Sequence, residues 1–119
     1  MNNLHDIGNG GELLALEFLG SHGFSIIKHN YRFSRFGEID IIAQKENLIV
    51  FIEVKIRFSE HFGGALYSIG PKKKKNILKT AKKFISENYK LITKDTIFRF
   101  DLISIENNAI TWVEDIIRG

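Results

Sequence analysis

Three charged residues of types that bind metals and move protons, Asp40, Glu53 and Lys55, stand close together in the chain. The segment from Phe36 to Arg57 reads Phe-Gly-Glu-Ile-Asp-Ile-Ile-Ala, then four polar residues, then Leu-Ile-Val-Phe-Ile-Glu-Val-Lys-Ile-Arg. This pattern predicts two strands and a turn. Side chains alternate between the faces of a strand, so Glu53 and Lys55 share a face. The second strand is apolar on both faces at its beginning, which indicates a central strand whose charged end borders a cleft.

The length of the turn decides whether the two carboxylates meet. An even number of loop residues places Asp40 on the same face of the sheet as Glu53, and an odd number without a bulge separates them. With the four-residue loop Gln44–Asn47, Asp40 lies opposite Phe51 and Glu53 is its diagonal neighbour. Diagonal neighbours are about 7–8 Å apart at Cα, close enough for both carboxylates to hold one metal.

Two carboxylates and a lysine suit a hard divalent cation such as Mg²⁺ or Mn²⁺, with Asp40 and Glu53 as ligands. A bound cation can activate a water molecule and stabilise charge on a phosphoryl oxygen. Lys55 would orient that water or offset the developing charge. The alternative is an ordinary cross-strand ion pair on the surface of a sheet. No histidine pair has metal-ligand spacing, and the chain has no cysteine, so a zinc site is not expected.

A helix is predicted over residues 10–21, with an apolar stripe at helical spacing. Glu12 borders this stripe, so its carboxylate could reach the sheet and join Asp40 and Glu53 as an additional ligand. Glu12 also has capping-box spacing from Asn9, which would direct it back to the start of the helix. Both interpretations stay open.

A second helix is predicted over residues 71–88, with Pro71 in a favoured first position. Its first turn contains the lysines 72–75, where the helix dipole favours acidic residues. Residues 72–94 hold nine lysines and one acid, whereas the rest of the chain has eight basic and thirteen acidic residues. We expect Lys72, Lys73, Lys74 and Arg57 to contact phosphates of a nucleic acid. The alternative is a solvated charge run. The apolar stripe of this helix is predicted to be Ile77, Leu78, Ala81, Phe84 and Ile85.

Further strands are predicted over residues 24–32, 96–105 and 110–113, and the helix before the fourth strand implies a parallel pair. The fold class is therefore α/β, a central mixed sheet flanked by helices in the order α-β-β-β-α-β-β. The 119 residues fit one domain, 1–119, with 1–6 as a loose tail. No apolar run is long enough for a membrane span, and the absence of cysteine and of a visible signal favours the cytoplasm.

The carboxylates and lysine resemble the D…E-x-K motif of restriction-endonuclease-like nucleases, and nearly the whole chain resembles the YraN family of small bacterial proteins. Ile39 stands where proline is more usual, and Ile56 where threonine is. The resemblance implies a nuclease-type fold similar to archaeal Holliday-junction resolvases, with branched DNA as substrate and a homodimer as the assembly. The matching segments are Gly11-Glu12, Asn30-Tyr31-Arg32, Gly37-Glu38-Ile39-Asp40, Phe51-Ile52-Glu53-Val54-Lys55 with Arg57, and Arg99-Phe100-Asp101.

The sequence thus favours a metal-dependent nuclease that hydrolyses phosphodiester bonds, with DNA as the favoured nucleic acid. One alternative is a non-catalytic nucleic-acid-binding module with the same fold, which needs no metal. Another is a basic protein-interaction domain whose lysines bind an acidic partner. Arg99 and Asp101 lie apart from this set and are expected to form a structural ion pair with neighbours.

Overall fold

The computed structural model describes residues 7–33, 35, 37–57 and 69–117. The predicted tail 1–6 and residues 58–68, which precede the second helix, lie outside this part of the chain. No helix within it is long and apolar enough to cross a membrane. Its elements are α1 (Ile7–Ser21), β1 (Ser25–Phe33), β2 (Gly37–Lys45), β3 (Leu48–Arg57), α2 (Pro71–Glu87), the 3-10 turn η2 (Tyr89–Leu91), β4 (Ile97–Glu106) and β5 (Ala109–Val113).

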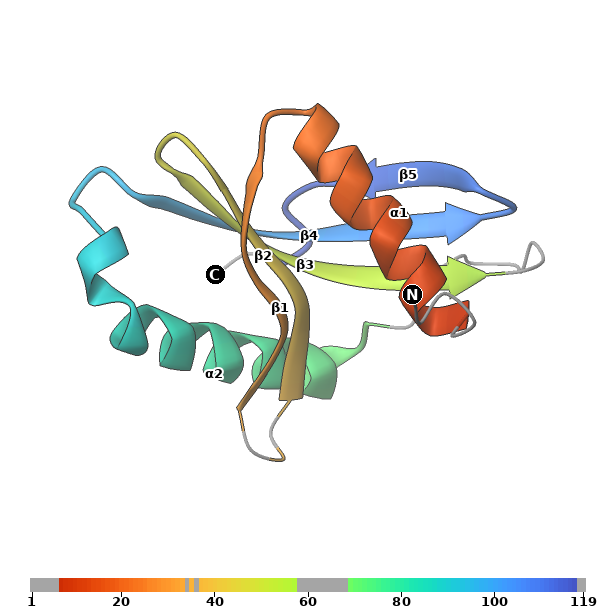
Figure 1. Ribbon diagram of the computed structural model, residues 1–119. Coiled ribbons are helices and arrows are strands. Elements are labelled where there is room, and N and C mark those ends of the chain that lie inside the picture. The colour runs from red at the N-terminus through yellow and green to blue at the C-terminus, as the bar shows by residue number, and fades with distance from the viewer. Residues whose placement is uncertain (1–6, 34, 36, 58–68, 118–119) are drawn as a thin grey trace.

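The strands form one mixed sheet in the order β1-β2-β3-β4-β5 (Figure 1). Strands β3 and β4 are parallel, and the other neighbours are antiparallel. A parallel pair needs a crossover connection, and α2 lies in that connection. The predicted class, a small α/β domain with a mixed sheet and two helices in this order, is confirmed.

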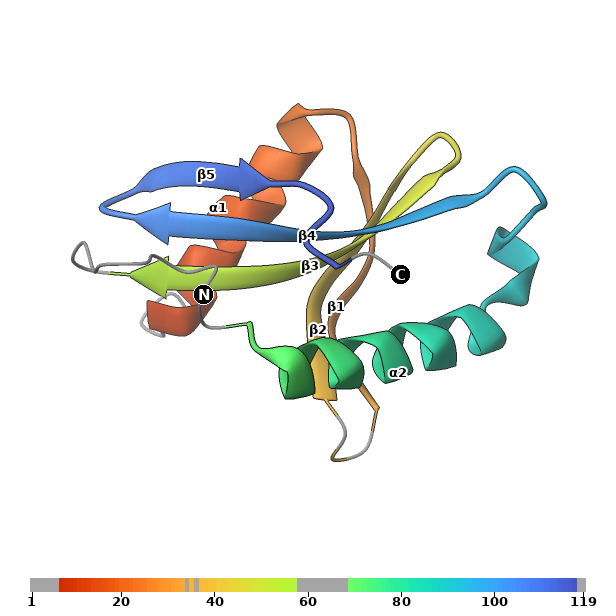
Figure 2. The same cartoon turned by 180° about the vertical axis from the view of Figure 1, so that it is seen from behind.

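The two helices cover opposite faces of the sheet, as Figures 1 and 2 show from the two sides. On β3, Val50 and Ile52 pack in the cluster that contains Ala15 and Leu19 of α1. Their neighbours Ile49 and Phe51 pack against Ile77, Ala81 and Phe84 of α2. Strand β3 is therefore buried on both faces, as its continuous apolar run predicts.

The β2–β3 turn is shorter than predicted. Lys45 pairs with Leu48 and Gln44 with Ile49, so the loop is Glu46-Asn47 rather than Gln44–Asn47. Glu46 adopts the left-handed conformation that such a tight turn requires, with φ 55°. Polar side chains at the start of the turn do not prevent backbone pairing, so the strands extend by two residues. Both the predicted and the observed loop have an even number of residues, so Asp40 still belongs to the same face of the sheet as Glu53.

Beyond the Ile41–Ile52 pair, β2 bends away from β3 (Figure 1). Asn30, on the adjacent part of β1, has φ 57°. Ile41 packs in the α1 cluster, whereas Ile39 packs in the α2 cluster. Regular strand alternation would place Ile39 and Ile41 on one face of the sheet, but the bend reorients the strand between them. The same bend separates β2 from the end of β3.

The buried stripe of α2 also differs from the prediction. Ile77, Thr80, Ala81 and Phe84 are buried, and Leu78 is exposed. Thr80 donates a hydrogen bond to the carbonyl of Asn76 at 2.8 Å, which satisfies its hydroxyl inside the core. The helix is thus rotated so that a small polar residue, rather than Leu78, faces the sheet.

Candidate functional site

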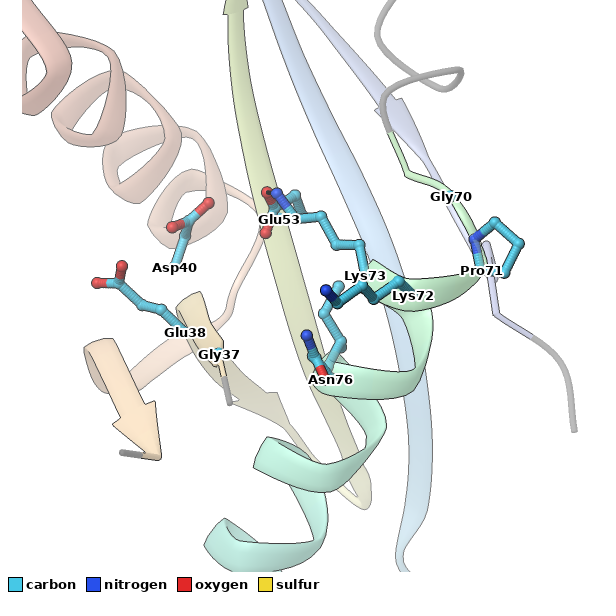
Figure 3. A pocket seen from close by; sticks show the side chains of 10 residues that line it. Gly37, Glu38, Asp40, Glu53, Gly70, Pro71, Lys72, Lys73 and Asn76 are labelled. Atoms are coloured by element: carbon cyan, nitrogen blue, oxygen red, sulfur yellow. Dashed lines mark ion pairs between the residues drawn. The ribbon is translucent and has the colours of Figure 1, made fainter. Parts of the chain in front are cut away.

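Where β2 leaves β3, the sheet and the first turn of α2 border a cavity of about 570 Å³ (Figure 3). Charged side chains reach it from three elements: β2 provides Glu38 and Asp40, β3 provides Glu53, and α2 provides Lys72 and Lys73. The remaining lining residues are Gly37, Gly70, Pro71, Asn76 and Ile77.

Gly37 allows α2 to approach this end of β2 closely. A Cβ atom at Gly37 would lie 3.3 Å from both Asn76 Cβ and Thr80 Oγ1, tighter than most side-chain contacts. The helix begins at Pro71, immediately after its extended N-cap residue Gly70. These two features place the first turn of α2 beside the charged end of β3.

Asp40 sits at the point where the β2–β3 ladder stops. Its Oδ2 accepts a hydrogen bond from the backbone N–H of Val54 at 2.8 Å, replacing the next ladder bond. Burial raises the pKa of Asp40 most, and the charge of Glu53 raises it further. The Val54 hydrogen bond opposes both effects, and the resulting pKa is about 7 instead of the ordinary 3.8. Asp40 therefore changes charge near neutral pH.

Glu53 is a buried carboxylate with two lysine neighbours. Its side chain is 8% exposed, and its Oε2 lies 2.6 Å from Lys73 Nζ and 3.5 Å from Lys55 Nζ. Lys55 follows on the same strand, and Lys73 comes from α2. Two residues far apart in sequence thus share one carboxylate oxygen.

The two lysines respond differently to this arrangement. Burial lowers the pKa of Lys55, and the adjacent Lys73 lowers it further, against the opposing effect of Glu53. For Lys73 burial also lowers the pKa, but its hydrogen bond and charge interaction with Glu53 outweigh burial, so its pKa rises. Lys73 is the firmly charged partner, and Lys55 is the more easily deprotonated one.

Glu12 does not cap its helix. Helix α1 begins at Ile7, so Asn9 lies inside the helix and the capping-box prediction is wrong. The Oε1 of Glu12 instead lies 3.0 Å from Nε2 of His29 on β1. Its charge adds to the raised pKa of Asp40, although Glu12 does not line the cavity. Glu12 is therefore an electrostatic neighbour of the site, held by His29.

A glycine fixes the position of Glu12. Gly11 faces β3 so closely that a Cβ atom would collide with the side chain of Ile56. Ile56 directly follows Lys55, so this contact joins α1 to the charged end of β3. The expectation that Glu12 borders a buried helix face agrees with this packing.

The four predicted phosphate contacts separate into three groups. Lys72 and Lys73 line the cavity, whereas Lys74 borders a different hollow with Glu114 and Asp115. Lys72 and Lys74 lie about 100° from Lys73 in opposite directions around the helix, so only Lys72 is on the side that borders the cavity. Arg57 ends β3, and its side chain lies outside the described residues.

Two lining residues with polar side chains, Glu38 and Asn76, were not among the predicted site residues. Glu38 lies two positions before Asp40, and its Oε1 is 3.4 Å from Nη2 of Arg32. Its charge also raises the pKa of Asp40. Asn76 follows Lys73 by three positions on α2. The strand alternation of Glu38 with Asp40, and the helical spacing of Asn76 from Lys73, were the signals in the sequence.

The donor set fits a cation that keeps much of its water. Among the described residues, no group of three or more histidine, aspartate or glutamate side chains is arranged to hold a metal ion. Magnesium is commonly held by one or two carboxylates, with water and substrate phosphates completing its coordination. Asp40 and Glu53 supply two such carboxylates. Burial and, after it, repulsion by Glu53 raise the pKa of Asp40, and a divalent cation would relieve that repulsion.

Comparison with known proteins connects the chain to relatives over most of its length. The model of the uncharacterised protein family UPF0102 matches residues 11–105. A UPF0102 protein of Sulfurihydrogenibium sp. (strain YO3AOP1) is 48% identical over 101 residues, which cover 85% of this chain and 84% of the relative. A UPF0102 protein of Caldicellulosiruptor bescii is 45% identical over 103 residues, which cover 87% of this chain and 84% of the relative. A UPF0102 protein of Vibrio parahaemolyticus is 38% identical over 113 residues, which cover 93% of this chain and 91% of the relative.

Proposed function

This chain belongs to the uncharacterised protein family UPF0102, and we propose that it is a metal-dependent nuclease that hydrolyses phosphodiester bonds in DNA. The family membership agrees with the YraN resemblance and carries no activity by itself. The proposal rests on the site. Its central observation is the placement of Asp40 and Glu53 at one cavity, with Lys55 3.5 Å from the Glu53 carboxylate.

In the proposed reaction Asp40 and Glu53 would hold Mg²⁺ or Mn²⁺, and such a cation would supply activation of a water molecule and stabilisation of charge on a phosphoryl oxygen. Lys55 lies beside Glu53 and orients the water or donates to the phosphoryl oxygen. Its lowered pKa, caused first by burial and then by Lys73, suits a group that exchanges a proton with water. Glu12 acts from outside the cavity by shaping the charge at Asp40.

The fold proposed for the chain is restriction-endonuclease-like. Three features support it: a mixed sheet with helices on both faces, the acidic residue of β2 beside the E-x-K segment of β3, and the bend of β2 at that point. Branched DNA as substrate and a homodimer as assembly are part of the same proposal, through the resemblance to resolvases.

A row of lysines on α2 supports nucleic acid as the partner. Their spacing of three, four and three residues places them on one side of the helix, over a length of about 15 Å. The row starts at the cavity, so a nucleic-acid strand bound there can continue along α2 with its phosphates facing the lysine ammonium groups. The exposed members are Lys72, Lys75, Lys79 and Lys82.

The second candidate function is a nucleic-acid-binding module without catalysis. One observation favours it: the ammonium of Lys73, 2.6 Å from Glu53, already neutralises the buried carboxylate without a metal. Salt titration of DNA binding separates both functions from a protein-interaction domain, because phosphate contacts predict a steep loss of affinity with salt.

Calorimetric titration of Mn²⁺ and Mg²⁺, with cleavage of branched and linear DNA measured in parallel, tests the nuclease. We expect Asp40→Asn and Glu53→Gln to lose metal binding and cleavage, and Lys55→Ala to keep metal binding and lose cleavage. Glu46→Gln, an exposed carboxylate in the β2–β3 loop, is the matched control and retains both. Absence of metal binding and cleavage in the wild type would support the binding module instead.

A further inference from the structure

Among the residues that line the cavity, the shortest ion pair that the structure describes joins a lysine to a proposed metal ligand. Lys73 Nζ lies 2.6 Å from Oε2 of Glu53, and Lys55 Nζ lies 3.5 Å from the same oxygen. A divalent cation bound at this oxygen would stand within a few ångströms of two ammonium groups. Like charges at such distances repel strongly in a partly buried site, so at least one ammonium has to move when the cation binds.

The two lysines differ in how easily they can move. Lys55 projects from β3 two residues after Glu53, on the same central strand, and its side chain is 27% exposed. Lys73 belongs to the first turn of α2, across the cavity, and its side chain is 37% exposed. A lysine ammonium sits on a flexible four-carbon stem. Lys73 can therefore leave Glu53 by rotation into the cavity that it lines (Figure 3).

The destination is favourable for a phosphate. Lys72 lines the same cavity, and both lysines stand in the first turn of a helix of seventeen residues. The N–H groups of a first helical turn attract anions, and the ammonium groups add to that attraction. In the cavity, a Lys73 side chain released from Glu53 would contact a phosphate of a bound nucleic-acid strand, next to the two carboxylates.

We propose that Lys73 is an internal counter-ion of Glu53, which a divalent cation displaces and which then binds a substrate phosphate. This inference rests on the proposed function. It assigns Lys73 a substrate-binding role that depends on the metal and is distinct from the role of Lys55. It also makes metal binding and nucleic-acid binding cooperative, because the same ammonium is tied to Glu53 without the metal and available to phosphate with it. Such coupling is reciprocal.

Metal affinity gives the first test. Mn²⁺ is titrated calorimetrically into wild type, Lys73→Met and Lys73→Gln, and circular dichroism verifies that each variant is folded. Without the competing ammonium, both variants are expected to bind Mn²⁺ about tenfold more tightly. Lys72→Met removes the same charge from the same turn without an ion pair to Glu53, and should change the affinity by no more than about twofold.

The coupling gives the second test. Anisotropy of a labelled duplex with a non-cleavable phosphorothioate backbone is measured with and without Ca²⁺, a divalent cation that also binds oxygen ligands. We expect Ca²⁺ to raise DNA affinity about tenfold in wild type and in Lys72→Met, and no more than about twofold in Lys73→Met. Lys72→Met should weaken DNA binding at both conditions.

The outcomes separate the two proposals. Mn²⁺ binding of equal strength in wild type and Lys73→Met, or an equal gain from Ca²⁺ in both, would overturn the role of Lys73 and leave the nuclease proposal standing. Failure of wild type and both Lys73 variants to bind any divalent cation would overturn both proposals.

Discussion

Two buried carboxylates on neighbouring strands have opposite surroundings. Asp101 of β4 is completely buried, and fixed donors saturate its oxygens. Arg99 donates from Nε at 2.9 Å to Oδ1 and from Nη2 at 2.8 Å to Oδ2, Trp112 Nε1 donates at 2.8 Å, and the backbone N–H of Asp115 donates at 2.9 Å. Arg99 and Asp101 thus have the structural role that the sequence predicts: they pair with each other, and their contacts join β4, β5 and the segment after β5.

Glu53 of β3 is nearly as buried, but its partners are the flexible ammonium groups of Lys55 and Lys73. It faces a cavity, and its neighbour Asp40 has a pKa raised to about 7. The contrast shows how a structural charge differs from a candidate functional one. A saturated carboxylate stabilises the fold, whereas one held by movable cations beside open space can exchange partners.

Matched amide substitutions test this contrast most strongly. Asp101→Asn leaves the partly buried Arg99 guanidinium with only the exposed Glu114, 3.6 Å away, as a counter-charge, so it should lower the free energy of unfolding by about 3 kcal/mol. Glu53→Gln should lower it by no more than about 1 kcal/mol, because Lys55 and Lys73 can extend to solvent. Urea denaturation of both variants measures the difference. Equal losses would show that Glu53 is also a structural charge.

The raised pKa of Asp40 makes the free energy of unfolding depend on pH. Because the folded-state pKa is near 7 and the ordinary value is 3.8, the folded protein holds this proton more tightly. Stability from Asp40 is therefore complete below about pH 4, and is lost as pH rises to about 7, by roughly 2–4 kcal/mol. Asp40→Asn should remove this loss and be more stable than wild type at pH 8. Urea denaturation across pH measures both proteins; parallel curves would contradict the shift.

The packing of α1 against β3 beside the site should affect the free energy of unfolding less than the charges of Asp101 and Asp40 do. Gly11→Ala should lower the free energy of unfolding by about 1–3 kcal/mol, because the new methyl group collides with Ile56 behind Lys55. Gly20→Ala, in the same helix, is the control. Its Cβ meets no atom within 4 Å, so it should be neutral or stabilising by up to about 1 kcal/mol. Thermal unfolding of both variants measures the difference, and equal destabilisation would contradict the close contact at Gly11.

Much of the fold could be predicted from periodicity. The apolar run of β3, the placement of Pro71 and the alternation along β4 locate the elements to within a few residues. The bend of β2 could not be predicted, because it depends on where the β2–β3 ladder stops and not on the residues of β2 alone. The two-residue turn was missed for a related reason: the polar residues Gln44 and Lys45 pair as well as apolar ones.

For the site, the alternation of side chains along β2 and β3 predicts that Asp40 and Glu53 lie on one face of the sheet, because every connecting loop with an even number of residues gives that result. The Lys73–Glu53 contact was only partly predictable. Helical spacing indicates that Lys73 or Lys74 leans towards the sheet, but the rotation of α2 decides between them, and that rotation follows from the burial of Thr80 in place of Leu78. Whether Glu12 belongs to the site required the start of α1 and the position of His29.

Three acidic residues near Asp40 raise its pKa to different extents. The pKa of Asp40 can be followed by carbon NMR of its carboxyl group in wild type and in variants that each lose one neighbouring charge. Glu53→Gln should lower this pKa most, Glu12→Gln less and Glu38→Gln least, because their charges raise it in that order. The pKa should stay above 3.8 in each variant, since burial is the largest cause of the shift. A decrease in Glu12→Gln that equals the one in Glu53→Gln would place Glu12 inside the carboxylate pair and make it a third candidate ligand.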